Sequence, residues 1–201
     1  MSDSTDQSFK AITDFMDGRG YVYSSQPEEH RIGFTMGSKQ ADYRFSILIV
    51  EGGDYLKYVA YCPFRVDEKL RLSVAELIVR ANYCLLAGKF EMDMSDGEVR
   101  FTLSHLIDGV VLSPETVGRL YRSCLFTLDR YMPAFMQHIH AGYTPEDAVF
   151  HAELDYHTDR VPDQPKRTKP RSTPPSEKPT DQTEKKPHRR KRDKGQGELP
   201  F

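Results

Sequence analysis

Four acidic residues lie within eight positions of one predicted hairpin: Glu91, Asp93, Asp96 and Glu98. Clustered carboxylates can hold a metal ion or exchange protons in acid–base catalysis. Because side chains alternate along a strand, Glu91 and Asp93 share one face. A calcium loop needs more ligands at alternating positions and a later glutamate, which this run lacks. We therefore interpret these carboxylates as the solvated outer face of a hairpin, without a metal.

Histidines could also bind a metal, but their spacing argues against it. His138 and His140 are two positions apart on a predicted helix, so they do not face each other. His151 and His157 have no cysteine or carboxylate set at ligand spacing. All four are interpreted as surface histidines, and no metal site is predicted.

The three cysteines, Cys62, Cys84 and Cys124, each sit in an apolar run and share no metal-type spacing. Cys84 has no neighbour that would activate a thiolate, so it is interpreted as a buried structural thiol. The chain also lacks a Walker A loop, a GxGxxG turn and a GxSxG elbow. The sequence thus predicts no catalytic residue and no cofactor, and the chain is not expected to be an enzyme.

Charge divides the chain into two parts. Residues 1–156 carry 15 Lys and Arg against 23 Asp and Glu, whereas residues 157–201 carry 13 against 7. The second part also contains 8 of the 13 prolines and one aromatic residue, Phe201. Such a segment cannot bury enough apolar surface to order itself. We expect one domain over residues 1–156 and a disordered tail over residues 157–201.

The polar, acidic start and the short apolar runs predict neither a signal peptide nor a membrane span. With its unpaired cysteines, the chain is expected to be cytoplasmic, with no membrane partner.

Apolar periodicity predicts the first half of the domain. Residues 5–17 have apolar residues at helical spacing. Three extended segments separated by glycine-containing turns follow: Arg31–Met36, Tyr43–Val50 and Tyr55–Phe64.

Ser73 and Glu76 form a capping box that predicts a helix from Ser73 to Ala87. One face of this helix carries Val74, Leu77, Ile78, Ala81 and Leu85. Its back face is apolar too, through Val79, Tyr83 and Leu86. One sheet cannot cover both faces. The back face therefore needs either the later helix or a second subunit, and we expect a homodimer with Tyr83 and Leu86 on the dimer face.

Strands Phe90–Met94 and Glu98–Leu106 are predicted to pair across a type I′ turn at Asp96-Gly97. Ser113-Pro114 begins a long amphipathic helix that Pro133 should kink or restart and Gly142 should end. Thr144-Pro145 opens a last short helix. The predicted class is a two-layer α+β fold in the order α-β-β-β-α-β-β-α-α, with an antiparallel sheet packed against helices.

Residues 75–153 resemble the YbjN family of bacterial proteins. The stretches that carry the likeness are ANYCLLAGKFEMDMSDGEVRF, LSPE, DRYMPAF and GYTPEDAV. The matching positions are Asn82, Gly88, Asp93, Gly97, Glu98, Ser113, Asp129, Tyr131, Pro133, Gly142 and Pro145. The resemblance implies a fold similar to type III secretion chaperones, which is commonly dimeric, and it implies no catalytic residues.

The tail contains two candidate binding elements. Arg189, Arg190, Lys191 and Arg192 could neutralise nucleic-acid phosphates, and without interleaved aromatic residues such contact with DNA would be non-specific. The last six residues resemble the peptide by which bacterial replication and repair proteins bind the sliding clamp, with Gln196, Leu199 and Phe201 at its anchor positions. Gly197 departs from that pattern, where leucine is usual.

Two functions remain open from these observations, and an enzyme that uses the acidic hairpin ranks below both. The first is a non-enzymatic, protein-binding adaptor with a chaperone-like module, tethered by its basic tail to the sliding clamp. The second is a dimeric chaperone or regulator of an unknown client protein, with a tail that only solubilises it.

Overall fold

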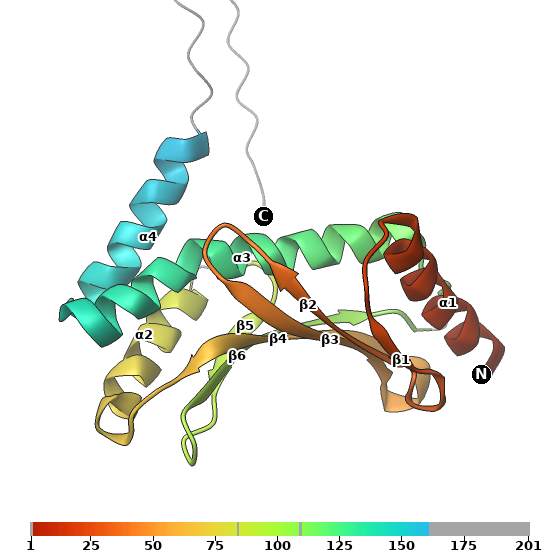
Figure 1. The fold of residues 1–201 in the computed structure, drawn as a ribbon, viewed down its shortest axis with the longest axis horizontal. Coiled ribbons are helices and arrows are strands. Elements are labelled where there is room, and N and C mark those ends of the chain that lie inside the picture. The colour runs from red at the N-terminus through yellow and green to blue at the C-terminus, as the bar shows by residue number, and fades with distance from the viewer. Residues whose placement is uncertain (1, 84, 109, 161–201) are drawn as a thin grey trace, which may run out of the picture. The chain divides into compact units, whose positions relative to one another are not determined.

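A six-stranded antiparallel sheet and four helices form the part of the chain that the computed structural model describes, residues 2–83, 85–108 and 110–160 (Figure 1). The helices are α1 (Ser2–Gly18), α2 (Arg71–Tyr83), α3 (Pro114–Ala141) and α4 (Pro145–Arg160). The strands are β1 (Ser24–Gln26), β2 (Arg31–Gly37), β3 (Asp42–Val50), β4 (Tyr55–Arg65), β5 (Lys89–Met92) and β6 (Glu98–Leu106). The predicted α+β class is confirmed, with β1 as one strand more than expected.

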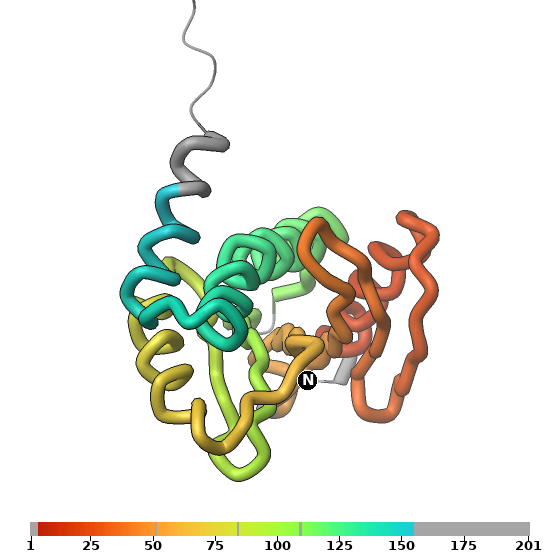
Figure 2. Tube along the Cα trace, turned by 60° about the vertical axis from the view of Figure 1, so that its left-hand side comes forward, coloured from red at the N-terminus to blue at the C-terminus, as the bar shows by residue number. Residues whose placement is uncertain are grey.

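The strands lie in the order β1-β2-β3-β4-β6-β5, and every neighbouring pair is antiparallel. In β3, Tyr43, Phe45, Ile47 and Ile49 are buried and alternate with more exposed residues. Helix α3 crosses the face that these side chains share, with α1 at one end and α2 and α4 at the other (Figures 1 and 2). The opposite face of the sheet carries none of these helices, and we call it the helix-free face.

Aromatic side chains join the two layers. Tyr121 of α3 lies 5.3 Å from the ring of Phe45 and 6.0 Å from the ring of Phe15 in α1. Tyr58 of β4 donates a hydrogen bond of 2.9 Å to the backbone carbonyl of Val117. A buried tyrosine hydroxyl needs such a partner, so this bond fixes α3 at one position above the sheet.

Helix α2 differs from the prediction at both ends. It begins at Arg71, directly after a short 3-10 helix, Glu68–Leu70, so the predicted capping box at Ser73 is wrong. Ser73 instead donates to the carbonyl of Leu70 and contacts His138 of α3. The helix ends at Tyr83 and does not reach the predicted end at Ala87.

Gly88, in the loop after α2, has a positive φ of 76°. A Cβ atom there would lie 2.4 Å from the ring of Phe101. Only glycine allows the chain to pass this close to the sheet.

The β5–β6 hairpin forms as predicted, but its turn does not have the predicted geometry. Gly97 has a positive φ of 76°, whereas Asp96 does not, and a type I′ turn needs positive φ at both central residues. The turn has four residues, Met94–Gly97. A hydrogen bond from the Asp93 amide to the Glu98 carbonyl closes it. The predicted type I′ turn is therefore wrong.

Helix α3 continues through Pro133 without the predicted restart. Its predicted ends are confirmed, since Ser113 caps its first turn and Gly142, with a φ of 75°, follows its last.

Thr144 accepts a hydrogen bond from the amide of Asp147 at the start of α4. Helix α4 runs to Arg160 and so passes through the domain boundary that we predicted at residue 156.

The tail lies almost wholly beyond the described residues. The predicted disorder, the basic block at Arg189–Arg192 and the peptide with Gln196, Leu199 and Phe201 all fall there. Within the described helices, none has the length and hydropathy needed to cross a membrane.

Candidate protein-binding surfaces

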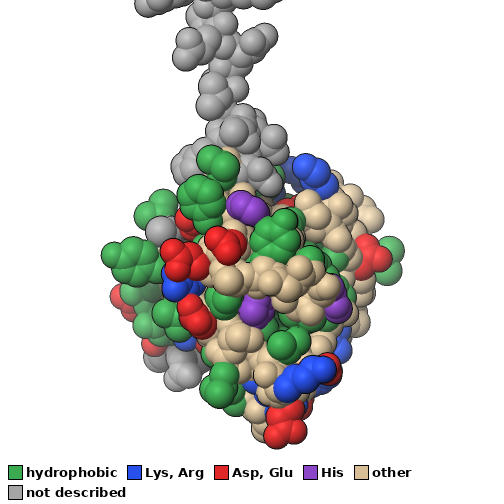
Figure 3. All heavy atoms as spheres, turned by 90° about the vertical axis from the view of Figure 1, so that its left-hand side faces the viewer, with side chains coloured by type: hydrophobic (Ala, Val, Ile, Leu, Met, Phe, Trp, Pro, Cys, Tyr) green, Lys and Arg blue, Asp and Glu red, His purple; other side chains and the backbone are tan. Residues whose placement is uncertain are grey.

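An apolar surface covers the end of the domain where α2 and α4 pack together, and we call it the α2–α4 surface. Its groove has a volume of about 380 Å³ and is lined by Val79, Arg80, Tyr83, Glu146, Val149, Phe150 and Glu153. Tyr83 is 90% exposed, Val79 70% and Phe150 60%. Figure 3 faces this end, where hydrophobic side chains reach the surface between acidic ones.

Two ion pairs and a hydrogen bond hold the rim of the α2–α4 surface. Arg80 of α2 lies 2.9 Å from Glu76 and 3.3 Å from Glu146 of α4, so it bridges the two helices. Glu153 accepts a hydrogen bond of 2.9 Å from Tyr131 of α3. The groove therefore has fixed charges of both signs around an apolar centre.

The two residues predicted for the dimer face lie at this end of the chain's helical layer. Tyr83 lines the groove, and Leu86 follows it in the loop after α2, where it is fully exposed. The alternative that a later helix covers Tyr83 is excluded, because α4 packs beside α2 and leaves Tyr83 open. Sequence analysis missed Phe150 and Leu154, although their spacing of four residues places both on one face of α4.

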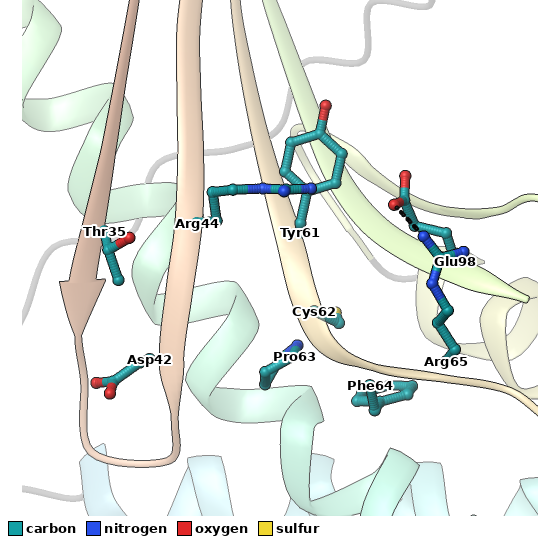
Figure 4. A pocket seen from close by; sticks show the side chains of 9 residues that line it. All are labelled: Thr35, Asp42, Arg44, Tyr61, Cys62, Pro63, Phe64, Arg65 and Glu98. Carbon is teal, nitrogen blue, oxygen red and sulfur yellow. Dashed lines mark hydrogen bonds and ion pairs between the residues drawn. The ribbon is translucent and has the colours of Figure 1, made fainter. Parts of the chain in front are cut away.

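A second hollow, of about 450 Å³, lies on the helix-free face and is shown in Figure 4. We call it the Arg44 hollow; it is lined by Thr35, Asp42, Arg44, Tyr61, Cys62, Pro63, Phe64, Arg65 and Glu98. The guanidinium of Arg44 stacks on the ring of Tyr61, its partner on β4, at 4.3 Å from the ring centre. Sequence analysis missed this hollow.

A bulge in β4 shapes the Arg44 hollow. The pairing of β4 with β6 jumps from Tyr61–Arg100 to Arg65–Glu98, so three residues of β4 lie opposite one residue of β6. Pro63 is in that bulge, and proline inside a strand is the sequence signal that could have predicted it.

The four carboxylates of the acidic hairpin all make structural interactions. Asp93 accepts from the amide and hydroxyl of Ser95, and Asp96 accepts from the amide of Glu98 and from Arg65. Glu98 also pairs with Arg65, at 3.2 Å. These bonds close the turn.

Glu91, on the neighbouring strand, is held by three donors. Its carboxylate lies 2.8 Å from Lys89, 3.0 Å from Arg100 and 3.0 Å from the hydroxyl of Thr102. Partial burial alone would raise the pKa of Glu91, but these hydrogen bonds outweigh it and lower that pKa to about 2. A carboxylate held ionised in this way is poorly suited to donate or accept protons near neutral pH.

Among the histidines considered as ligands, His138 and His151 make contacts within the fold, and His140 is exposed. His138 contacts the Tyr143 carbonyl at 2.7 Å and Ser73 at 2.9 Å, so it joins α3 to α2 and is not the free surface residue we expected. The ring of His151 packs edge-on against Tyr143. Burial raises the pKa of the Cys62 and Cys124 thiols to about 12.

Metal ligation and reactive thiols find little support in this part of the chain. Among the described residues, no group of three His, Cys, Asp or Glu side chains is placed to hold a metal ion. Thiols with the raised pKa of Cys62 and Cys124 stay protonated at neutral pH and are weak nucleophiles. Cys84 and the side chain of His157 lie outside the described residues.

Three solved chains are similar to this chain at low sequence identity. YbjN from E. coli has 13% identity and a TM-score of 0.46, covering 75% of this chain and 92% of that one. A chain of the HopA1-SchA chaperone-effector complex has 11% identity and a TM-score of 0.46, covering 63% and 93%. A chain of the ExsC-ExsE complex has 15% identity and a TM-score of 0.45, covering 67% and 94%.

Comparison with curated proteins gives no significant match. The sequence profile of the YbjN family, described as "Putative bacterial sensory transduction regulator", matches residues 8–137. This match includes the first half of the domain, for which the sequence motifs had given only the order of strands and helices. The chain belongs to the YbjN family.

Proposed function

We propose that this chain is a non-catalytic, protein-binding regulator that acts as a homodimer joined through the α2–α4 surface. The observation that carries the proposal is the exposed apolar groove around Val79, Tyr83 and Phe150. Side chains of this size each contribute roughly 1.5–3 kcal/mol when they are fully buried. Contiguous apolar surface rimmed by charge is typical of a protein interface.

A second copy of the chain fits this surface because the surface can complement itself. In a two-fold dimer the same patch faces itself, so it must supply both members of each contact. Arg80 provides a cation at the groove, and Glu146 and Glu153 provide anions. In such a dimer the apolar residues Val79, Tyr83 and Phe150 of the two copies would meet at the centre, while Arg80 and Glu146, already paired within each copy, would lie at the rim.

Substitution of Tyr83 tests the dimer without disturbing the core. Because Tyr83 is 90% exposed, Tyr83→Glu should fold normally and sediment as a monomer. Phe126→Glu is the matched control, since Phe126 is also an exposed aromatic residue on a helix, at 59%. It should sediment as a dimer, like the unchanged chain. A monomeric unchanged chain, or a Tyr83→Glu variant that remains dimeric with unchanged circular dichroism, would refute the proposal.

A more specific form of the proposal is that the regulator is an adaptor, which its tail tethers to the sliding clamp. This part rests on the sequence alone, on Gln196, Leu199 and Phe201 at the terminus and the basic block at Arg189–Arg192 before them. A flexible tether raises the local concentration of a weakly binding module without adding contacts. Attraction of the basic block to DNA would act in the same direction.

The second candidate is a dimeric chaperone or regulator of a client protein, with a tail that only solubilises it. The family description as a regulator is compatible with either candidate. Removal of residues 164–201 separates them, because it removes the basic block and the terminal peptide and keeps the whole of α4. Capture of purified sliding clamp by the full chain but not by the shortened chain would favour the tether. Equal capture by both, or by neither, would favour the second candidate.

A further inference from the structure

The helix-free face carries more basic than acidic side chains, although the domain itself is acidic. Residues that pair directly across antiparallel strands point to the same face. The register therefore puts six basic residues on this face: Arg31, Arg44, Lys57, Arg65, Lys89 and Arg100. It puts three acidic residues there: Asp42, Glu91 and Glu98.

Most of these basic side chains already have a carboxylate partner. Arg31 pairs with Glu29, Arg65 with Asp96 and Glu98, and both Lys89 and Arg100 with Glu91. Arg44 and Lys57 have no ion pair among the residues the structure describes. Of these two, Arg44 lies in the hollow.

Stacking leaves Arg44 ready to bind an anion. The ring of Tyr61 covers one flat side of the guanidinium, while the N–H donors lie along its edges. Figure 4 shows the Arg44 side chain extended toward Tyr61, with the carboxylate of Asp42 near the start of the same strand, β3. The stack fixes the side chain in advance, so less conformational entropy is lost when a ligand binds.

The rest of the hollow selects a singly charged group. Thr35 lies directly across from Arg44 on β2 and offers a hydroxyl, while Pro63 and Phe64 provide apolar surface. Arg65 also lines the hollow and pairs with Glu98, while Asp42 adds negative charge beside Arg44, so a doubly charged phosphate is repelled more than a singly charged carboxylate. A carboxylate has the charge and the planar shape that match one arginine fork.

We propose that the Arg44 hollow binds the carboxylate of an Asp or Glu side chain in an extended segment of a partner protein. This inference rests on the proposed protein-binding function, and it adds a second contact site on the opposite layer from the α2–α4 surface. Arg44 forms the ion pair, Thr35 donates a further hydrogen bond, and the apolar residues of the bulge pack against the neighbouring side chain of the segment.

Two labelled peptides test the proposal by fluorescence anisotropy with the full chain. One alternates valine with glutamate, and the other has glutamine in place of each glutamate. Residues 189–192 are changed to glutamine in every sample, because that basic block attracts acidic peptides by itself. Loss of one charge-assisted pair should weaken binding by about tenfold.

The expected result is that the glutamate peptide binds, and that Arg44→Gln or the glutamine peptide weakens binding about tenfold. Arg44→Lys should bind with an intermediate affinity, because it keeps the charge but loses the fork. Arg122→Gln, at an exposed arginine of α3, is the matched control and should bind like the unchanged chain. Sodium phosphate should compete no better than sodium chloride of equal ionic strength.

Four results would overturn the proposal: no binding of the glutamate peptide, equal binding by Arg44→Gln, equal binding of the glutamine peptide, or preferential competition by phosphate. The monomeric Tyr83→Glu variant separates this proposal from the dimer. If that variant keeps its affinity for the peptide, the hollow acts independently of the α2–α4 surface. If Tyr83→Glu binds weakly while Arg44→Gln binds normally, the peptide site lies at the dimer face and the Arg44 hollow is refuted.

Discussion

Asn82 in the last turn of α2 makes two hydrogen bonds with the backbone of Phe90 in β5. Its side-chain amide donates to the Phe90 carbonyl at 3.0 Å, and its side-chain oxygen accepts from the Phe90 amide at 2.8 Å. One side chain thus satisfies both backbone groups of an edge-strand residue and fixes the end of α2 that carries Tyr83.

Asn82→Ala should destabilise the domain by about 1–3 kcal/mol, because it leaves a part-buried amide and carbonyl without a partner. The measurement is the urea midpoint of unfolding. Gln40→Ala removes an exposed side-chain amide and is the matched control, with an expected change within about 0.5 kcal/mol. Equal midpoints for the two variants would show that the Asn82 contact does not hold α2 to the sheet.

Gly88→Ala should destabilise the domain more than Gly142→Ala. The two glycines have nearly equal φ angles, 76° and 75°, so the backbone strain of an added Cβ is similar. At Gly88 that Cβ also meets Phe101 and the Thr102 carbonyl, whereas nothing lies within 4 Å at Gly142. The difference in unfolding free energy should be about 1–3 kcal/mol, the usual effect of overpacking. Equal free energies would mean that the loop after α2 is free to move away from the sheet.

Protonation of Glu91 should lower the free energy of unfolding as the pH falls in the acid range. Its folded pKa, about 2, is below the value near 4.3 of an unfolded glutamate, so the folded state binds the proton more weakly. The stabilisation is therefore complete above about pH 4.3 and is lost as the pH falls toward about 2. Urea midpoints measured down this range should fall less steeply for Glu91→Gln than for Glu76→Gln, whose ion pair with Arg80 is exposed. If the urea midpoints of the two variants fell equally steeply with pH, the lowered pKa of Glu91 in the folded state would be contradicted.

Strands β2, β3, β4 and β6 could be predicted from sequence because each buries one face, whereas β1, which was not predicted, has no buried residue. The alternation of Tyr43, Phe45 and Ile47 already marks the buried face of β3. The buried face of α2 was predicted for the same reason, and Val74, Leu77, Ile78 and Ala81 are all buried. Both patterns could be predicted because the spacing of apolar residues along the chain reflects which side chains face the core.

Features that depend on contacts between distant segments were not predictable in this way. Ser73 has the sequence context of a helix cap, yet His138, 65 residues later, takes its hydroxyl as a partner. The Arg44 hollow needs the β4 bulge and the register of four strands, and neither is encoded in local periodicity. The sequence analysis named Tyr83 and Leu86 but missed the exposed Phe150 beside Tyr83, because the last helix was expected to be short.

The terminal peptide should bind the sliding clamp through its apolar side chains. Replacing both Leu199 and Phe201 by alanine in the full chain should abolish binding to purified clamp, as measured by surface plasmon resonance. Neutralising Arg189–Arg192 should weaken binding to DNA-loaded clamp mainly at low salt. Unchanged binding by the double alanine variant would show that the motif is coincidental.

The molar mass of the full chain in solution tests the central claim most directly. Light scattering at low micromolar concentration should give twice the chain mass of 23.1 kDa. Under the same conditions, Tyr83→Glu should give 23.1 kDa with unchanged circular dichroism. A mass of 23.1 kDa for the unchanged chain, sustained as its concentration is raised, would contradict a homodimer built on the α2–α4 surface.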